Sequence, residues 1–395
     1  MEVLNKDIEK ISIINQFMKE LLSDESLISK REIYDKYKEI VNQVQPIDFF
    51  YLDMYKEDSE FTIEEIKESA GKFINVFHSA LSNYEPSGYD STLFSYFLKE
   101  NRAIERELDK LKPYFKQSNI VGNVKEIIKG FEKLFELEKK FIKKENILWP
   151  SIEEKLPSIM PLKVLWSMHD DSRVVLKNIL IALKKEILDV TNVVFLIGEY
   201  YYLIYGLNQK EELILLPVAD TLLSLEEKDK MYEESLEFGY CFIDELPKPK
   251  EDKTEKKIEE GIFKTKTGSL SMKEIDSLFS YIPLDITFVD VNNKVKYFNN
   301  RPERHFPRNP SIVGRLVKYC HPPKSVEVVE RIVDAFKNGE EDFAEFWIDF
   351  RGTFLYITYY AVRDNAKNYM GILEVSQDVT KIRGLNGQQR LLDWK

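Results

Sequence analysis

The chain has 395 residues, of which 43% are hydrophobic and 32% are charged, and its formal net charge is −11. This composition indicates a folded, soluble protein rather than a disordered one, and the length predicts two or three domains. The acidic balance argues against non-specific binding to nucleic acid, because such binding depends on Lys and Arg neutralising phosphates.

Cysteine usage and apolar runs bear on the compartment. Cys241 and Cys320 are far apart and neither has a CxxC partner, so the sequence indicates neither a disulfide framework nor a zinc site. Met1–Lys10 does not resemble a signal peptide. The longest apolar stretch, Val193–Leu207, is too short to span a bilayer and contains Glu199. We therefore expect a cytoplasmic protein without a membrane partner.

Residues 1–84 are predicted to form a small helical domain. Apolar residues recur at helical spacing from residue 8 to 22, and a later helix begins at the capping pattern Thr62-x-x-Glu65. His78 lies one position beyond the apolar stripe of that helix, which favours a partly buried, hydrogen-bonded histidine over a metal ligand.

Residues 85–245 are predicted to form a helical bundle. Four long helical patterns are joined by short connections, and they lie at about 90–116, 121–148, 161–188 and 190–210. Short connections favour antiparallel neighbours, so an up-and-down four-helix bundle is the most economical packing. One more helix is expected at Leu225–Phe238.

A charged linker is predicted at 246–268, because PKPKEDKTEKKIEE is nearly free of apolar residues. Residues 269–381 then contain a short helix, two strand patterns, a loop, an amphipathic helix and three strand patterns. The strand patterns lie at Ile286–Asp290, Lys294–Phe298, Phe343–Phe350, Phe354–Arg363 and Tyr369–Val375. This order predicts an α+β domain with a five-stranded antiparallel sheet, followed by a C-terminal tail at 382–395.

Several motifs of this region carry a resemblance to a known family. They are PLDITFVD (Pro283–Asp290), KVKYFNNRPERHFPR (Lys294–Arg308), CHPPKS (Cys320–Ser325), AEFWIDFRG (Ala344–Gly352) and LEVSQDVTKIR (Leu373–Arg383). They resemble the C-terminal PAS domain of bacterial and archaeal proteins that also carry an N-terminal domain of unknown function and a hemerythrin-like (HHE) bundle. The resemblance covers the final third of the chain strongly and the rest moderately to weakly.

The bundle region is similar to hemerythrin-type proteins, in which histidines and carboxylates hold two iron ions. The similarity rests on KKENILWP (Lys143–Pro150), WSMHDDSR (Trp166–Arg173) and KEELILLP (Lys210–Pro217). In this register Lys140, Gly206 and Ser95 stand near positions where the family has histidines.

The resemblance leaves Glu145, His169 and Glu212, or its neighbour Glu211, as residual metal ligands. A cluster with one histidine would bind a hard metal weakly. We therefore expect a bundle kept as structure, without a di-iron centre.

The PAS resemblance also implies a ligand. PAS domains bind small molecules between the sheet and the helix that follows the Cys-His-Pro-Pro corner, and in some of them a histidine there holds haem iron. His321 would be the axial ligand, or Cys320 as thiolate. The basic residues that could receive haem carboxylates are Arg301, Arg304, Arg308, Arg315 and Lys324. His321 could instead be a helix cap or loop contact, and the ligand a flavin or a fatty acid.

No enzyme signature is present: the sequence lacks a phosphate-binding loop, HExxH, GxSxG and a Rossmann glycine run. We expect a non-catalytic, cytoplasmic sensory or regulatory protein whose PAS domain binds a small ligand, for which haem is the sharpest candidate, and which signals through an unidentified protein partner. Two alternatives stay open. One is a metal-binding oxygen or redox protein that uses the bundle, and the other is an interaction module that forms homodimers through the PAS sheet.

Overall fold

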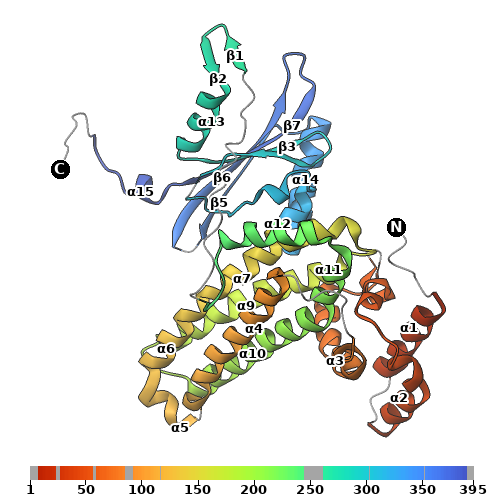
Figure 1. Cartoon of the computed structure of the whole chain (residues 1–395). Coiled ribbons are helices and arrows are strands. Elements are labelled where there is room, and N and C mark those ends of the chain that lie inside the picture. Colours follow the sequence, from red (N-terminus) through yellow and green to blue (C-terminus); the bar gives the residue numbers. More distant parts are fainter. Residues whose placement is uncertain are drawn as a thin grey trace. The chain divides into compact units, whose positions relative to one another are not determined.

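The computed structural model describes residues 8–23, 27–56, 59–84, 92–115, 117–243, 261–301, 303–350 and 352–388. The chain divides into two compact units, Met1–Lys250 and Glu251–Lys395. The first unit is helical and the second contains a sheet with helices (Figure 1). An α-helical region followed by an α+β region was predicted, and the structure confirms this order.

The helical unit begins with three helices that share a core with the rest of the unit. They are α1 (Ile8–Ser23), α2 (Leu27–Val41) and α3 (Ile63–Ser82). The predicted cap of α3 is present, since the Thr62 hydroxyl accepts a hydrogen bond from the Glu65 N–H at 3.3 Å. One buried apolar cluster extends from Ile11 to Cys241. The described parts of 1–84 and 85–245, which were predicted as separate domains, therefore pack together.

The helices of this unit after α3 are α4 (Thr92–Leu111), α5 (Gln117–Ile120), α6 (Val124–Lys133), α7 (Leu137–Lys143), η6 (Lys144–Leu148), α8 (Trp149–Ile152), α9 (Met160–Leu183), α10 (Val190–Lys210), η8 (Glu211–Leu215), α11 (Leu216–Leu222) and α12 (Leu225–Leu236). Three of the four predicted long helices of this unit are present as α4, α9 and α10, whereas the one predicted at 121–148 is divided into several shorter helical segments. Helix α9 packs on α6 and α10, and α4 packs on α6, α10 and α12.

One continuous helix of the described chain, Val190–Leu222, is long and apolar enough to cross a membrane by length and composition alone. One side of it, including Ile197 and Ile204, is buried in the core of the helical unit. Core helices of this kind pass the same test, so the helix is weak evidence for a membrane span.

The C-terminal unit contains the predicted five-stranded antiparallel sheet. Its strands are β3 (Asp285–Asp290), β4 (Val295–Phe298), β5 (Phe343–Phe350), β6 (Thr353–Arg363) and β7 (Tyr369–Asp378), in the order β4-β3-β7-β6-β5. Helix α14 (Pro323–Asn338) packs on the sheet (Figure 1) and buries Val333 and Phe336 against Val289 and Ile372. Gly339, at φ +74°, ends α14, as Asn338-Gly339 indicated.

The predicted linker at 246–268 was too long. Its residues 246–260 lie outside the described part of the chain, but Ile262–Thr265 form β1, which pairs with β2 (Gly268–Ser271). In the turn between β1 and β2, the Thr265 hydroxyl accepts a hydrogen bond from the Thr267 N–H at 3.2 Å. Helix α13 (Met272–Tyr281) follows β2. Helix α15 (Thr380–Arg383) lies across the predicted start of the tail at 382, and residues 389–395 of the tail are outside the described part of the chain.

Gly371 in β7 provides a test of the packing between β7 and β3. Its φ is +146°, and a Cβ there would lie 2.1 Å from the Val289 carbonyl oxygen. We expect Gly371→Ala to destabilise the C-terminal unit by at least about 3 kcal/mol, because the clash is with backbone. Calorimetry of the full chain should show the C-terminal transition at lower temperature, with the helical transition unchanged.

Gly352→Ala is the control for this prediction. Gly352 also has positive φ, +79°, but a Cβ there meets nothing within 4 Å. Its cost should be limited to the backbone term of about 1 kcal/mol. Equal effects of the two substitutions would contradict the prediction.

Candidate functional site

Two turns of π-helix interrupt the α-helices of the helical unit, and both occur just before a proline. η6 and η8 are single π turns, and each is followed by an aromatic or aliphatic residue and then a proline. Because proline has no N–H, it cannot continue the helical hydrogen-bond pattern. The N–H groups of Trp149 and Leu216 bond to the carbonyl oxygens five residues earlier, on Lys144 and Glu211. Such turns are frequent at functional sites.

The two turns bring a carboxylate and two ammonium groups together in the core. Glu211 Oε2 lies 3.0 Å from Lys144 Nζ and 3.2 Å from Lys140 Nζ. All three side chains are at most 1% exposed. Burial raises the pKa of the Glu211 carboxyl, but the ammonium groups of Lys140 and Lys144 outweigh it and lower the pKa to about 2. Glu211 is therefore ionised at neutral pH.

A second buried ion pair lies close to the first. Lys143 Nζ is 2.8 Å from Glu100 Oε1, and neither side chain is exposed. The same oxygen accepts from the Cys241 N–H at 2.7 Å. Glu100 Oε2 is buried without a hydrogen-bond partner. The centre of the helical unit is thus ionic rather than purely apolar.

His169 and Glu145, two of the predicted metal ligands, contact each other. His169 Nδ1 is 2.8 Å from Glu145 Oε1, which also lies 3.0 Å from Arg173 Nη2. The imidazole is stacked between the rings of Phe141 and Trp149. Burial, and after it the charge of Arg173, lowers the pKa of His169 well below its usual value. The ring is neutral, and its Nε2 has no hydrogen-bond partner.

Glu212, the third predicted metal ligand, has other partners. It accepts from Asn101 Nδ2 at 3.1 Å and pairs with Arg102 at 2.5 Å. Across the described residues, no three His, Cys, Asp or Glu side chains are grouped so that they could hold a metal ion. The donor set does not fit a di-iron centre, because the Glu211 carboxylate is already held by two cations that would repel a metal ion.

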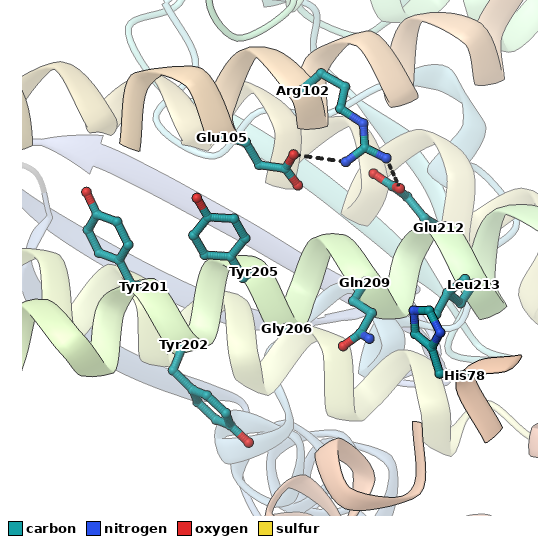
Figure 2. Close-up of a pocket in the computed structure, with 10 residues that line it drawn as sticks. All are labelled: His78, Arg102, Glu105, Tyr201, Tyr202, Tyr205, Gly206, Gln209, Glu212 and Leu213. Carbon is teal, nitrogen blue, oxygen red and sulfur yellow. Dashed lines mark hydrogen bonds and ion pairs between the residues drawn. The ribbon is translucent and has the colours of Figure 1, made fainter. Parts of the chain in front are cut away.

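Glu212 instead lines an open pocket between α3, α4 and α10 (Figure 2). The pocket has a volume of about 450 Å³. Its lining residues are His78, Arg102, Glu105, Tyr201, Tyr202, Tyr205, Gly206, Gln209, Glu212 and Leu213. Gly206, where the resemblance expected a histidine, leaves a gap in the side chains along α10.

In the C-terminal unit, Cys320 ends η10 (Val317–Cys320), and His321 lies between η10 and α14. His321 Nδ1 is 2.9 Å from the Val317 carbonyl oxygen, to which it donates. Pro322 occupies the N-cap position of α14, so His321 is a loop contact and not the cap. Cys320 Sγ lies 3.8 Å from the Leu316 carbonyl oxygen.

Several of the five basic residues predicted to receive haem carboxylates (the predicted rim) make their contacts within the protein. Arg301 pairs with Asp285 at 3.1 Å. Arg304 Nη1 donates to the Asn299 side-chain oxygen at 2.8 Å and to its carbonyl at 2.9 Å. Arg315 is buried and Lys324 is exposed. These four residues therefore do not converge on one ligand position.

Arg308 differs from the other predicted rim residues. Its Nη2 is 3.9 Å from Glu374 Oε2, and both side chains are 10% exposed. Arg308 Nε is buried without a hydrogen-bond partner. Glu374 lies on β7 opposite Tyr359 and Thr287, on the face that packs against α14. Burial lowers the pKa of His321, and the charges of Glu374 and Arg308 also act on that ring.

Comparison with known proteins identifies a domain in the C-terminal unit. A family model described as "PAS domain" matches residues 275–380. These residues form a PAS domain. No curated protein matches the chain.

Two solved structures are similar to the PAS domain region. The C-terminal domain of a Streptococcus mutans protein is 35% identical, with a TM-score of 0.30, and the match covers 32% of this chain and 98% of that one. The PAS domain of a Colwellia psychrerythraea protein is 16% identical, with a TM-score of 0.23, and covers 28% and 98%.

The PAS domain fits haem only in part. His321 could offer Nε2, since Nδ1 is fixed by the Val317 carbonyl. However, the guanidinium groups of Arg301 and Arg304 are bonded within the protein and are not free to receive two carboxylates. The chemistry of His321 thus suits an axial ligand, whereas two of the five predicted carboxylate receivers, Arg301 and Arg304, already have partners in the protein.

Sequence reasoning missed the buried partners in both units. Glu100, Lys143, Lys144 and Glu374 were not singled out as site residues, because each sits among charged or alternating residues that suggest a solvated face. One sequence pattern could have pointed to these residues, because it occurs twice, at Lys144–Pro150 and Glu211–Pro217. In each case two charged residues are followed by three mostly apolar residues and then by Trp-Pro or Leu-Pro.

The acid stability of the helical unit should depend on Glu211. Its pKa falls from an ordinary 4.5 to about 2 in the fold. The stabilisation is complete above about pH 4.5 and is lost as pH falls towards 2, and it amounts to roughly 3 kcal/mol. We expect Glu211→Gln to destabilise the unit at pH 7 by roughly this amount and to flatten the acid dependence, measured by urea unfolding followed by circular dichroism.

Glu227→Gln is the matched control. Glu227 pairs with Lys155 at 2.6 Å, but its side chain is 43% exposed. Exposed pairs contribute less than about 1 kcal/mol. If both variants lost the same stability, the buried position of Glu211 would not be the cause.

Proposed function

We propose that this chain is a non-catalytic sensory or regulatory protein of the cytoplasm. In this proposal the PAS domain binds a small ligand, and the helical unit is the scaffold that passes the signal to a protein partner. The presence of a PAS domain supports a sensory role. We propose no metal chemistry for the helical unit, because lysine ammonium groups hold its central carboxylate.

The ligand proposal rests on the burial of Arg308 and on its lack of hydrogen-bond partners. Its side chain is nine-tenths buried, its Nε lacks a partner, and its contact with Glu374 is 3.9 Å long. A buried guanidinium held this loosely has unused donors. A carboxylate or other small anion could accept two parallel bonds from it, which is the strongest pairing that arginine makes. We therefore propose a small anionic ligand next to the α14-facing side of the sheet.

The pairing between Arg308 and Glu374 would tune such a site. A ligand anion and Glu374 would compete for one guanidinium, so the ligand must be small or carry its own donor toward Glu374. Tyr359 lies opposite Glu374, and burial and then Glu374 raise the pKa of its hydroxyl, which stays protonated as a donor. These groups favour a hydroxy acid or an amino acid over a fatty acid.

Haem remains the alternative ligand for the PAS domain. Burial lowers the pKa of His321, and a neutral imidazole is the form that binds iron. Bound haem would supply an iron centre for gas or redox sensing, and His321 would hold it.

A second candidate function is assembly through the PAS sheet. Trp347 and Tyr360 are 62% and 41% exposed on the face of the sheet opposite α14. Large exposed aromatic groups on one sheet face are typical of protein contacts. Analytical ultracentrifugation of wild type and Trp347→Glu would test this, and a monomeric wild type would exclude it.

The ligand proposal predicts that Arg308 determines binding. With a library of small carboxylates, at least one compound should raise the unfolding temperature of the PAS transition, since ligands stabilise the state they bind. Arg308→Gln should weaken that compound by about 10- to 100-fold, the usual value of a charge-assisted bond. Lys324→Gln, which removes an exposed charge of the predicted rim, should leave the affinity unchanged.

Reconstitution with hemin separates the two ligand classes. The anion proposal expects no stoichiometric complex and no Soret band sensitive to His321→Ala or Cys320→Ala. A stoichiometric complex whose Soret band shifts in His321→Ala would replace the anion proposal with haem.

A further inference from the structure

Helix α14 covers only part of the sheet face on which it packs. The apolar cluster under α14 includes Val333, and Ala344 of β5 packs against it. Phe346 and Ile348 lie on the same face as Ala344, because side chains two residues apart in a strand point the same way. Both are 38% exposed. Phe346 and Ile348 therefore form an uncovered apolar strip on the α14-facing side of the sheet.

The apolar strip adjoins the buried charges of the same face. The ring of Phe346 lies 6.0 Å from the ring of Tyr359. Tyr359 stands opposite Glu374 in the sheet, and Glu374 Oε2 lies 3.9 Å from Arg308 Nη2. Two residues before Arg308, the ring of Phe306 packs on an aromatic ring of β5. This part of the face is thus charged at one end and apolar at the other.

A carboxylate bound to Arg308 would lie beside the carboxylate of Glu374. Two carboxylates on one guanidinium repel each other, and the side chains of Arg308 and Glu374 are only 10% exposed, so water screens the repulsion poorly. A positively charged donor next to Glu374 would remove it. Arg304 does not supply this donor, because all three of its nitrogens already donate within the protein. We therefore expect the donor to come with the ligand.

We propose that the apolar strip and the Arg308–Glu374 pair together bind a free α-amino acid with a large apolar side chain. This inference rests on the anion site of the proposed function and adds to it the other two groups of the ligand. The α-carboxylate accepts from Arg308, the α-ammonium donates to Glu374, and the side chain covers Phe346 and Ile348.

The geometry of the charged pair favours this class of ligand. A free amino acid carries its carboxylate and its ammonium on one carbon, and this arrangement suits a guanidinium and a carboxylate that lie 3.9 Å apart. Both of its charged groups would make charge-assisted hydrogen bonds, whereas a hydroxy acid has only a neutral hydroxyl to offer Glu374. The amino acid is therefore expected to bind more tightly than the hydroxy acid of the same shape.

Isothermal titration calorimetry of the full chain tests this expectation without any variant. The probes are L-phenylalanine and L-leucine, each compared with its hydroxy acid, L-phenyllactate or L-leucic acid. At least one of the two amino acids should bind at least about 10-fold more tightly than its hydroxy acid, because the latter lacks the charge-assisted bond to Glu374. Glycine, which has no side chain to cover the apolar strip, should bind at least about 10-fold more weakly than that amino acid.

Glu374→Gln isolates the contribution of the ammonium group. It should reduce the ratio of the two affinities, amino acid over hydroxy acid, from at least about 10 to about 1, because Gln keeps the shape of Glu374 without its charge. Both affinities are measured on the same protein, so a loss of stability does not imitate the effect. Glu341→Gln, which removes an exposed carboxylate just after α14, should leave the ratio unchanged.

The outcomes separate this inference from the anion site on which it rests. Hydroxy acids that bind as tightly as the amino acids, and that lose affinity in Arg308→Gln, would overturn the inference and leave the anion site standing. An unchanged ratio in Glu374→Gln would do the same, and so would binding of another small carboxylate, dependent on Arg308, when neither amino acid binds. If no small carboxylate binds at all, both proposals are wrong.

Discussion

The helical unit depends on one buried carboxylate held between two buried ammonium groups. Removing Glu211 would leave Lys140 and Lys144 uncompensated in the core, and an unpaired charge in that environment is among the most costly defects a fold can have. A buried ion pair of this kind contributes little net stability by comparison with apolar packing, but it fixes which side chains must meet. It joins the helix that carries Lys140 to the helix that carries Glu211, much as a metal ion joins the helices that ligate it. Here the positive charge belongs to the chain itself.

The spacing of apolar residues predicted the fold, because helices in both units bury one side. The apolar stripe of α14 depends on which side of the helix faces the core, and this can be read locally. The domain boundary inside the helical unit could not be read in this way, since α1 to α3 contribute side chains to the same core as the later helices. The β1–β2 hairpin was missed for a different reason: its two strands are short and exposed, and hydrogen bonds between them define it.

The site residues were harder to predict than the fold. Lysines in a helical pattern usually face water, so the burial of Lys143 and Lys144 depends on distant acidic partners, Glu100 and Glu211, that no local pattern reveals. The arginines around Arg304 showed the opposite problem. They were grouped as a basic rim by number alone, whereas the fold uses Arg301 and Arg304 to hold β3 and the loop after β4. Counts of charge in a segment do not say which charges already have partners.

The two π turns carry a consequence for how this chain can change by insertion and deletion. Each turn holds one residue more than an α-helical turn of the same rise, so the helices on either side of it stay aligned. Loss of one residue within Lys144–Leu148 or Glu211–Leu215 would therefore restore a regular helix without rotating its flanks, and Lys140 and Lys210, which precede the turns, would keep their neighbours. What would change is the placement of the side chains inside each turn, and these include Lys144 and Glu211, which form a buried ion pair. A one-residue deletion in either turn would thus disturb the buried charges and leave the rest of the helix in place.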